Sequence, residues 1–89
     1  MYLHLGQSVT VPFRDVIGIF DLDNTTSSPI TRNFLRGAEK KGQVENVSDE
    51  LPKSFVICRS GDRKPKIYLS QLSSTTLRGR AESGVFMEI

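Results

Sequence analysis

The first twenty positions of the chain carry apolar side chains in patterns that are typical of short β-strands. Residues 2–5 form an apolar segment that ends before Gly6, and residues 9–13 carry an apolar side chain at every second position. Pro12 cannot donate a ladder hydrogen bond, so we expect either that this second strand lies at an edge of a sheet or that Pro12 lies at its end. Residues 16–20 are a denser β-branched run, which predicts a third strand in the centre of the sheet.

A helical pattern follows a polar turn over residues 21–28. Ser28 is a suitable N-cap, Pro29 suits the first helical position, and Gly42 is a plausible C-terminal stop. Between them, four apolar residues recur at helical spacing and predict one buried face, made by Ile30, Phe34, Leu35 and Ala38. We expect this to be the main helix of the protein.

The middle of the chain predicts a β-hairpin. Residues 44–52 are acidic and irregular, with room for a short strand. Residues 55–58 are an apolar strand closed by Cys58, residues 60–63 are turn formers, and residues 66–70 predict the returning strand.

The C-terminal segment predicts a short second helix over residues 73–80, weakened by two threonines and Gly79. Residues 84–89 form an apolar tail that needs a partner. The expected order is β-β-β-α-β-β-α, an α+β fold with a small, mainly antiparallel sheet. A chain of 89 residues has room for a single domain, spanning residues 1–89.

Composition narrows the class of protein. Cys58 is the only cysteine and His4 the only histidine, so we expect neither a disulfide framework nor a metal site, and no cofactor. No segment has the pattern of a signal peptide or the length of a membrane span, which favours a soluble, cytoplasmic protein without a membrane partner. The apolar share of 37 % gives a modest core, and self-association often supports domains of this size.

Positive charge is segregated along the chain. Between Pro52 and Ala81 there are seven basic residues against the single acid Asp62, a net charge of +6, whereas the whole chain carries only +2. A basic half can neutralise a polyanion such as nucleic acid, and it can equally keep a small protein soluble. Charge alone leaves both interpretations open.

One motif suggests an enzyme. Residues 16–25 are an apolar strand followed by D-x-D-x-T, which resembles the first motif of haloacid dehalogenase-type phosphatases. That family also needs a doubly wound parallel sheet, a downstream lysine and a later acidic pair, and the chain continues with one helix and a hairpin instead. We therefore interpret Asp21, Asp23 and Asn24 as a strand-to-helix turn and predict no catalytic residues and no enzymatic activity.

Five collinear segments together resemble a known family: Tyr2–Gly6, Val16–Asp23, residues 34–39, Leu51–Val56 and residues 68–77. Their order and spacing are similar to the RemA/RemB family of extracellular matrix regulators, and to its RemB branch in particular. The RemA branch implies a small DNA-binding transcription regulator of biofilm matrix genes. It also implies a ring-like homo-oligomer that lets DNA run along a basic surface.

The resemblance also implies candidate contact residues. RemA-type members carry an adjacent arginine pair before the strand expected at residues 55–58, where this chain has Leu51-Pro52-Lys53. They also place an arginine in the turn before the third strand, at or next to Arg14. Together with the basic segment, this gives a predicted DNA-binding set of Arg14, Lys53, Arg59, Arg63, Lys64 and Lys66.

Two functions follow as hypotheses. In the first, a homo-oligomer binds double-stranded DNA through its phosphates, with shape and backbone readout and with avidity from many copies. In the second, the chain is a protein-interaction or assembly adaptor with little or no DNA binding of its own, whose partner is a related regulator. Leu51-Pro52 in the contact loop and the apolar tail motivate this alternative.

Overall fold

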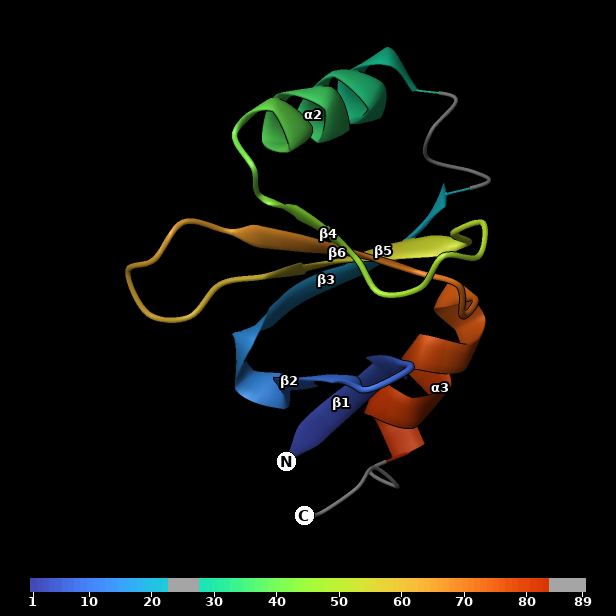
Figure 1. The fold of residues 1–89 in the computed structure, drawn as a ribbon. Helices are drawn as coiled ribbons and strands as arrows, with labels where there is room; N and C mark the ends of the chain where they lie inside the picture. Colours follow the sequence, from blue (N-terminus) through green and yellow to red (C-terminus); the bar gives the residue numbers. More distant parts are fainter. Residues whose placement is uncertain (23–27, 84–89) are drawn as a thin grey trace.

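The computed structural model describes residues 1–22 and 28–83, and within these ranges the strands form two sheets (Figure 1). β1 (Tyr2–Gly6) and β2 (Val9–Pro12) make an antiparallel pair, and a short 3-10 turn, η1 (Phe13–Asp15), follows. The second sheet has the order β3-β5-β6-β4, with the bounds β3 (Val16–Asp21), β4 (Val44–Asn46), β5 (Ser54–Cys58) and β6 (Lys66–Ser70).

The four-stranded sheet lies between two other layers. Helix α2 (Pro29–Lys40) covers one face, while the β1–β2 pair and helix α3 (Ser74–Ser83) cover the other (Figure 1). Each face therefore has its own apolar cluster. Phe55 and Ile67 belong to the α2 side, whereas Leu3, Leu5 and Leu77 belong to the side of β1 and α3.

β5 supplies both clusters because its side chains alternate between the two faces. Phe55 packs toward α2, with its ring stacked on that of Phe20 at a centroid distance of 5.0 Å, and Val56 and Cys58 pack toward β1. Full burial of a side chain such as Leu77 stabilises the fold by roughly 1.5–3 kcal/mol. Strand 55–58, closed by a buried Cys58, is confirmed as predicted.

The expected central position of residues 16–20 is wrong. β3 is an edge strand that pairs only with β5 among the described strands, and its register shifts between Val16 and Gly18. At this irregularity Ile17 stays 61 % exposed. The centre of the sheet belongs instead to β5 and β6, because a hairpin whose strands are covered on both faces buries more apolar surface than an edge strand does.

The predicted helix boundaries are largely confirmed. Pro29 opens α2, although the hydroxyl of Ser28 makes no capping hydrogen bond. Gly42 follows the helix with φ at +72°, a left-handed conformation that suits glycine and ends the helix. Helix α3 begins one residue later and ends three residues later than predicted, and Ser73 caps its start by accepting a hydrogen bond from the backbone N–H of Thr76 at 3.1 Å.

Strand pairing was predicted in part. The β1–β2, β3–β5 and β5–β6 pairs are antiparallel, as expected, but β4 pairs with β6 in parallel. The strands also divide between two sheets where a single small sheet was expected. The acidic segment of residues 44–52 was expected to contain a short strand, and β4 is that strand. Asp23, Asn24 and the apolar tail of residues 84–89 lie outside the described residues.

Candidate nucleic-acid interface

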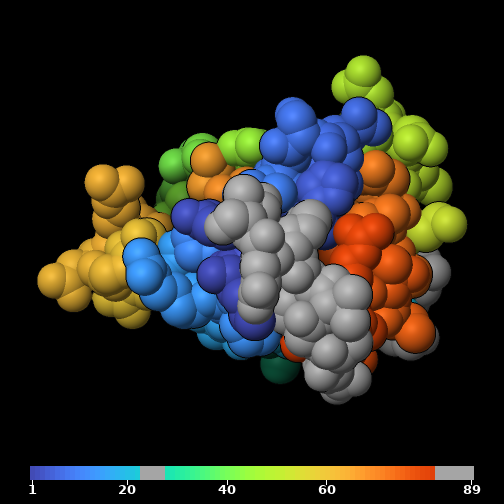
Figure 2. All heavy atoms as spheres, turned by 90° about the horizontal axis from the view of Figure 1, so that it is seen from below, coloured from blue at the N-terminus to red at the C-terminus, as the bar shows by residue number. Residues whose placement is uncertain are grey.

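The β5–β6 hairpin carries most of the predicted contact residues. Its connection, residues 59–65, turns through Gly61 at φ +57° and is closed by a 3.1 Å hydrogen bond from the Arg63 N–H to the Ser60 carbonyl oxygen. This connection extends past the end of the sheet, and its tip, coloured gold, projects from the body in Figure 2. Arg59, Arg63 and Lys64 are all exposed there.

A cavity of about 260 Å³ lies between this hairpin and β2, and we call it the hairpin notch. Residues 10–12 of β2 line one side of it, and the hairpin lines the other. The notch brings four of the six predicted residues together on one side of the protein, namely Arg59, Arg63, Lys64 and Lys66. Asp15, Cys58, Ser60 and Tyr68 complete the lining.

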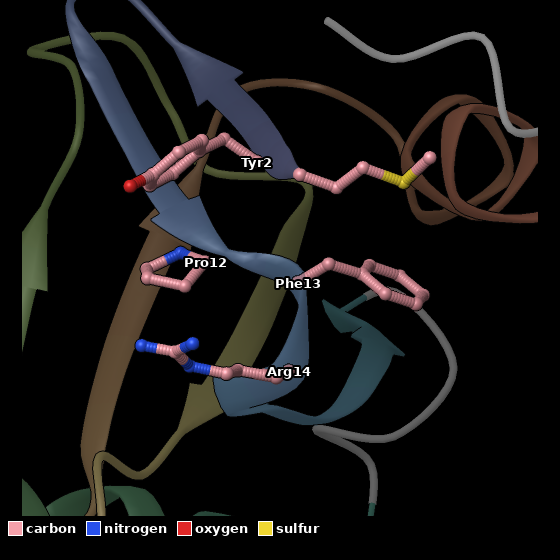
Figure 3. Close-up of a pocket in the computed structure, with 5 residues that line it drawn as sticks. Tyr2, Pro12, Phe13 and Arg14 are labelled. Atoms are coloured by element: carbon pink, nitrogen blue, oxygen red, sulfur yellow. The ribbon is translucent and has the colours of Figure 1, made fainter. Parts of the chain in front are cut away.

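Arg14 lies next to the notch without lining it. It sits in η1, and the Arg59 N–H donates a 2.8 Å hydrogen bond to the neighbouring Asp15 carbonyl oxygen, so η1 and the hairpin are held together. Figure 3 shows the side chains of Arg14, Pro12 and Tyr2 on the same side of this segment, with Phe13 pointing the opposite way. The Arg14 side chain is 89 % exposed.

Lys53 lies at the other end of the sheet. The Leu22 N–H donates to its carbonyl oxygen at 3.0 Å, and Leu22 follows the end of β3, whereas Arg14 precedes its start. Arg59 lies six positions after Lys53 along the extended strand β5, which corresponds to about 20 Å. The predicted set therefore forms two separate cationic positions on one copy of the chain, the hairpin side and Lys53.

Two cations of the hairpin side are already paired with acids. The Lys66 ammonium contacts a Glu45 carboxylate oxygen at 2.6 Å and lies 5.3 Å from the centre of the Tyr68 ring. The hydrogen bond to Glu45 is the main reason that the pKa of Lys66 is raised above its ordinary value. Arg14 lies 3.9 Å from the Asp15 carboxylate. Within the described residues, no ion pair engages Arg59, Arg63, Lys64 or Lys53.

Two further cations of the basic half hold α3 in place. Arg78 donates to the Ile19 carbonyl oxygen and Arg80 donates to the His4 carbonyl oxygen, both at 2.9 Å. Because these guanidinium groups bind backbone oxygens of β3 and β1, part of the positive charge between Pro52 and Ala81 stabilises the packing of α3 against the strands. The sequence contained no signal for this use, since the acceptors are main-chain atoms 59 and 76 residues away.

The pairing of Lys66 was also missed. It depends on the parallel register of β4 and β6, which brings Glu45 opposite Tyr68 and next to Lys66. Parallel strand pairing joins segments through a crossover, so local sequence spacing does not reveal it.

Cys58 lines the notch as a neutral thiol. Burial, and secondarily the charge of Asp15, raises its pKa from 9.0 to about 11. A thiol is nucleophilic only as the thiolate, so Cys58 is unsuited to nucleophilic chemistry near neutral pH. Asp21, the first carboxylate of the D-x-D-x-T segment, ends β3 on the far side from the notch, beside Ser54.

Helix α2 leaves apolar side chains uncovered. Ala38 is buried and Leu35 half-buried, as predicted, but Ile30 is 81 % exposed and Phe34 is 45 % exposed. The expectation that all four face the core is therefore wrong for two of them, because the α2 residues that pack in the apolar cluster, Leu35 and Ala38, lie in the C-terminal half of the helix. Leu51, in the loop before Lys53, is also 86 % exposed.

Comparison with known proteins gives one informative match. Searched against protein-family models, the chain matches none. It is 40 % identical over 82 residues to extracellular matrix regulatory protein B of Bacillus subtilis (strain 168), a match that covers 92 % of this chain and 91 % of that protein. Within the described residues, neither helix has the length and apolar composition needed to cross a bilayer.

Proposed function

The chain belongs to the RemB branch of the RemA/RemB family of extracellular matrix regulators, and on that premise we propose that it is a regulatory protein that binds double-stranded DNA as a homo-oligomer. The contacts are electrostatic and reach the phosphate backbone. The proposed contact residues are Arg14, Lys53, Arg59, Arg63, Lys64 and Lys66.

The observation that carries the proposal is the projecting hairpin with its uncompensated charge. Arg59, Arg63 and Lys64 are exposed, close together and without an ion pair among the described residues. Free cations release condensed counterions when they contact phosphates, whereas a paired cation must first lose its own partner. We therefore assign the leading contacts to these three residues and a weaker contribution to Arg14 and Lys66.

Oligomer formation would combine the two separated cationic positions. On one copy the hairpin side and Lys53 are about 20 Å apart along β5, so a single copy offers only a few phosphate contacts. Repeated copies present both positions many times along a duplex, and avidity then compensates for weak individual binding. The exposed apolar side chains Ile30 and Phe34 on α2, and Ile17 on β3, support self-association, because an interface would remove them from water.

A fluorescence anisotropy titration with duplex DNA at low and physiological salt tests this function. We expect binding that weakens steeply as salt increases, together with a light-scattering mass several times that of the monomer. The double variant Arg63→Ala/Lys64→Ala should weaken binding, whereas Lys40→Ala/Lys41→Ala, which removes the same charge at the C-terminal end of α2, should change it much less. A monomer that does not bind duplexes at low salt would contradict the proposal.

A second candidate function is assembly with a related regulator. Leu51 is 86 % exposed in the loop where the RemA branch carries its arginine pair, which favours an apolar protein contact at that position. In this case the purified protein should form a complex with a RemA-type relative that survives high salt and nuclease treatment. The variant Leu51→Asp should abolish this complex while leaving duplex binding by the chain alone unchanged.

A further inference from the structure

We propose that the hairpin notch is a seat for one phosphate group, either of a DNA backbone or of a free phosphorylated molecule. The inference deepens the proposed function where the phosphate belongs to DNA, and it stands by itself where the phosphate belongs to a small molecule. The inference assigns phosphate binding to a defined cavity, whereas the proposed function requires only an exposed charged surface.

The charge of the notch suits an anion. Four cationic side chains line it, against one lining carboxylate, that of Asp15; of the four, Lys66 is already paired with Glu45 at 2.6 Å, which leaves Arg59, Arg63 and Lys64 to provide the excess charge. Asp15 is partly buried, and the Arg14 guanidinium lies 3.9 Å from its carboxylate, so its charge is offset in part. Arg59 and Arg63 add guanidinium groups, whose planar arrays of N–H donors match phosphate oxygens. The notch therefore combines excess positive charge with directional donors.

The neutral groups of the lining are compatible with an anion. Thr10, Ser60 and Tyr68 contribute hydroxyls that can donate hydrogen bonds to phosphate oxygens. Burial raises the pKa of Tyr68, so its hydroxyl keeps its proton over a wider pH range. The raised pKa of Cys58 likewise keeps a negative thiolate out of the notch near neutral pH.

The size of the notch limits what it can hold. A cavity of about 260 Å³ is smaller than the roughly 300–1,000 Å³ typical of sites that enclose drug-sized ligands. A single phosphate group with a few ordered waters fits such a space, whereas a whole nucleotide would extend beyond it. The remainder of a larger ligand would therefore lie outside the cavity, along the hairpin.

The hairpin backbone can hold such a ligand without large rearrangement. The Arg59 N–H is fixed by its bond to the Asp15 carbonyl oxygen, and the Arg63 N–H by its bond to the Ser60 carbonyl oxygen. The opposite wall is β2, which is paired with β1 along its length. Both walls are thus part of hydrogen-bonded elements.

Titration of the 89-residue chain into inorganic phosphate, followed by phosphorus NMR line width at constant ionic strength, tests the seat directly. We expect saturable broadening with the wild-type protein. The broadening should be lost in Arg63→Ala/Lys64→Ala and retained in Lys40→Ala/Lys41→Ala, which removes equal charge from the other face of the sheet. Circular dichroism of both variants confirms that each is folded.

A second arm separates the two sources of phosphate. Phosphate is added to a protein–duplex complex and compared with sodium chloride of equal ionic strength. If phosphate displaces the duplex more effectively than chloride does, a DNA phosphate uses the seat. If broadening is specific but the duplex is not displaced, or does not bind at all, the seat belongs to a free phosphorylated molecule and the proposed DNA contact at the hairpin fails.

One outcome overturns the inference. If the line width does not change, or changes equally with the hairpin and α2 variants, the notch is not a phosphate seat. That result would hold even if duplex binding persisted, because backbone contacts by exposed cations do not require a cavity. Failure of the seat and failure of the proposed function are therefore distinguishable.

Discussion

The hydroxyl of Ser70 donates a 2.6 Å hydrogen bond to the backbone carbonyl oxygen of Leu5. Ser70 ends the central strand β6, and Leu5 lies near the end of β1 in the other sheet, so this bond joins the two sheets across 65 residues of sequence. Both residues are fully buried. The same serine oxygen also accepts a 3.0 Å hydrogen bond from the Leu72 N–H, which positions the segment leading into α3.

Ser70→Ala should therefore lower the free energy of unfolding by roughly 1–3 kcal/mol, because the Leu5 carbonyl oxygen and the Leu72 N–H both lose a buried partner. Chemical denaturation measures this change. Ser60→Ala, at an exposed turn position, is the matched control and should stay within about 0.5 kcal/mol of the wild type. Equal effects of the two substitutions would show that the buried bond contributes little.

The buried thiol of Cys58 should make stability depend on alkaline pH. Its pKa is about 11 in the folded protein against 9.0 as the ordinary value, so between these values the unfolded chain loses a proton that the folded chain keeps. Stability from this group is complete below pH 9.0 and is lost as the pH rises toward 11, with a slope of up to about 1.4 kcal/mol per pH unit.

Denaturation of the wild type and of Cys58→Ala across this pH range tests the prediction. The variant should show a shallower decline, whatever its absolute stability, because tyrosine and lysine side chains titrate in both proteins. Parallel declines would mean that the thiol ionises alike in the folded and unfolded states.

Glu45→Gln should strengthen duplex binding several-fold, because it frees Lys66 from its 2.6 Å partner. One additional phosphate contact steepens the logarithmic salt dependence by about 0.9. The two side chains are 49 % and 42 % exposed, so the free energy of unfolding should change by less than about 1 kcal/mol. The control is Glu39→Gln on α2, which removes one negative charge at a position that does not contact Lys66. If this control strengthens binding equally, the effect comes from the total charge of the protein.

Lys53→Ala and Arg59→Ala should each weaken duplex binding, and their effects on the binding free energy should add in the double variant. Additivity is expected because the two positions lie about 20 Å apart, beyond the range at which neighbouring side chains couple. Anisotropy titrations of the four proteins measure it. No loss of affinity with Lys53→Ala would remove that residue from the interface and leave the hairpin side alone.

Phe34→Ser should lower the light-scattering mass of the assembly without unfolding the chain. Phe34 is 45 % exposed on α2, so the substitution removes apolar contact surface at small cost to the core. Asn33→Ser, at the adjacent exposed position, is the control and should leave the mass unchanged. An unchanged mass in both variants would place the interface elsewhere, for example at Ile17.

The helix and the hairpin could be predicted because their signals are local. Pro29 and Gly42 limit α2 through their own backbone preferences, and the turn around Gly61 lies between two apolar strands. The position of β3 could not be predicted in this way. Its apolar run resembles that of a central strand. It is an edge strand because, among the described strands, it pairs with β5 alone, and the register irregularity near Ile17 leaves that side chain exposed.

The candidate site was predicted in its residue types but only partly in its geometry. Arg59, Arg63, Lys64 and Lys66 come together because the hairpin brings nearby residues to one end of the sheet. Lys53 is separated from these four residues because the strand β5 lies between Lys53 and Arg59. The sequence implies this separation once residues 55–58 are recognised as a strand. The pairing of Lys66 with Glu45 was not predictable, since it needs the parallel register of β4 and β6.

The sequence by itself determined the elements, the segregation of charge and the family, because each of these depends on the order of residues along the chain. The tertiary structure alone decided which cations remain uncompensated. Arg78 and Arg80 bind carbonyl oxygens of distant strands and Lys66 meets an acid from a parallel neighbour, whereas Arg59, Arg63 and Lys64 project beyond the sheet. Charge neutralisation depends on distance in space, and folding sets that distance.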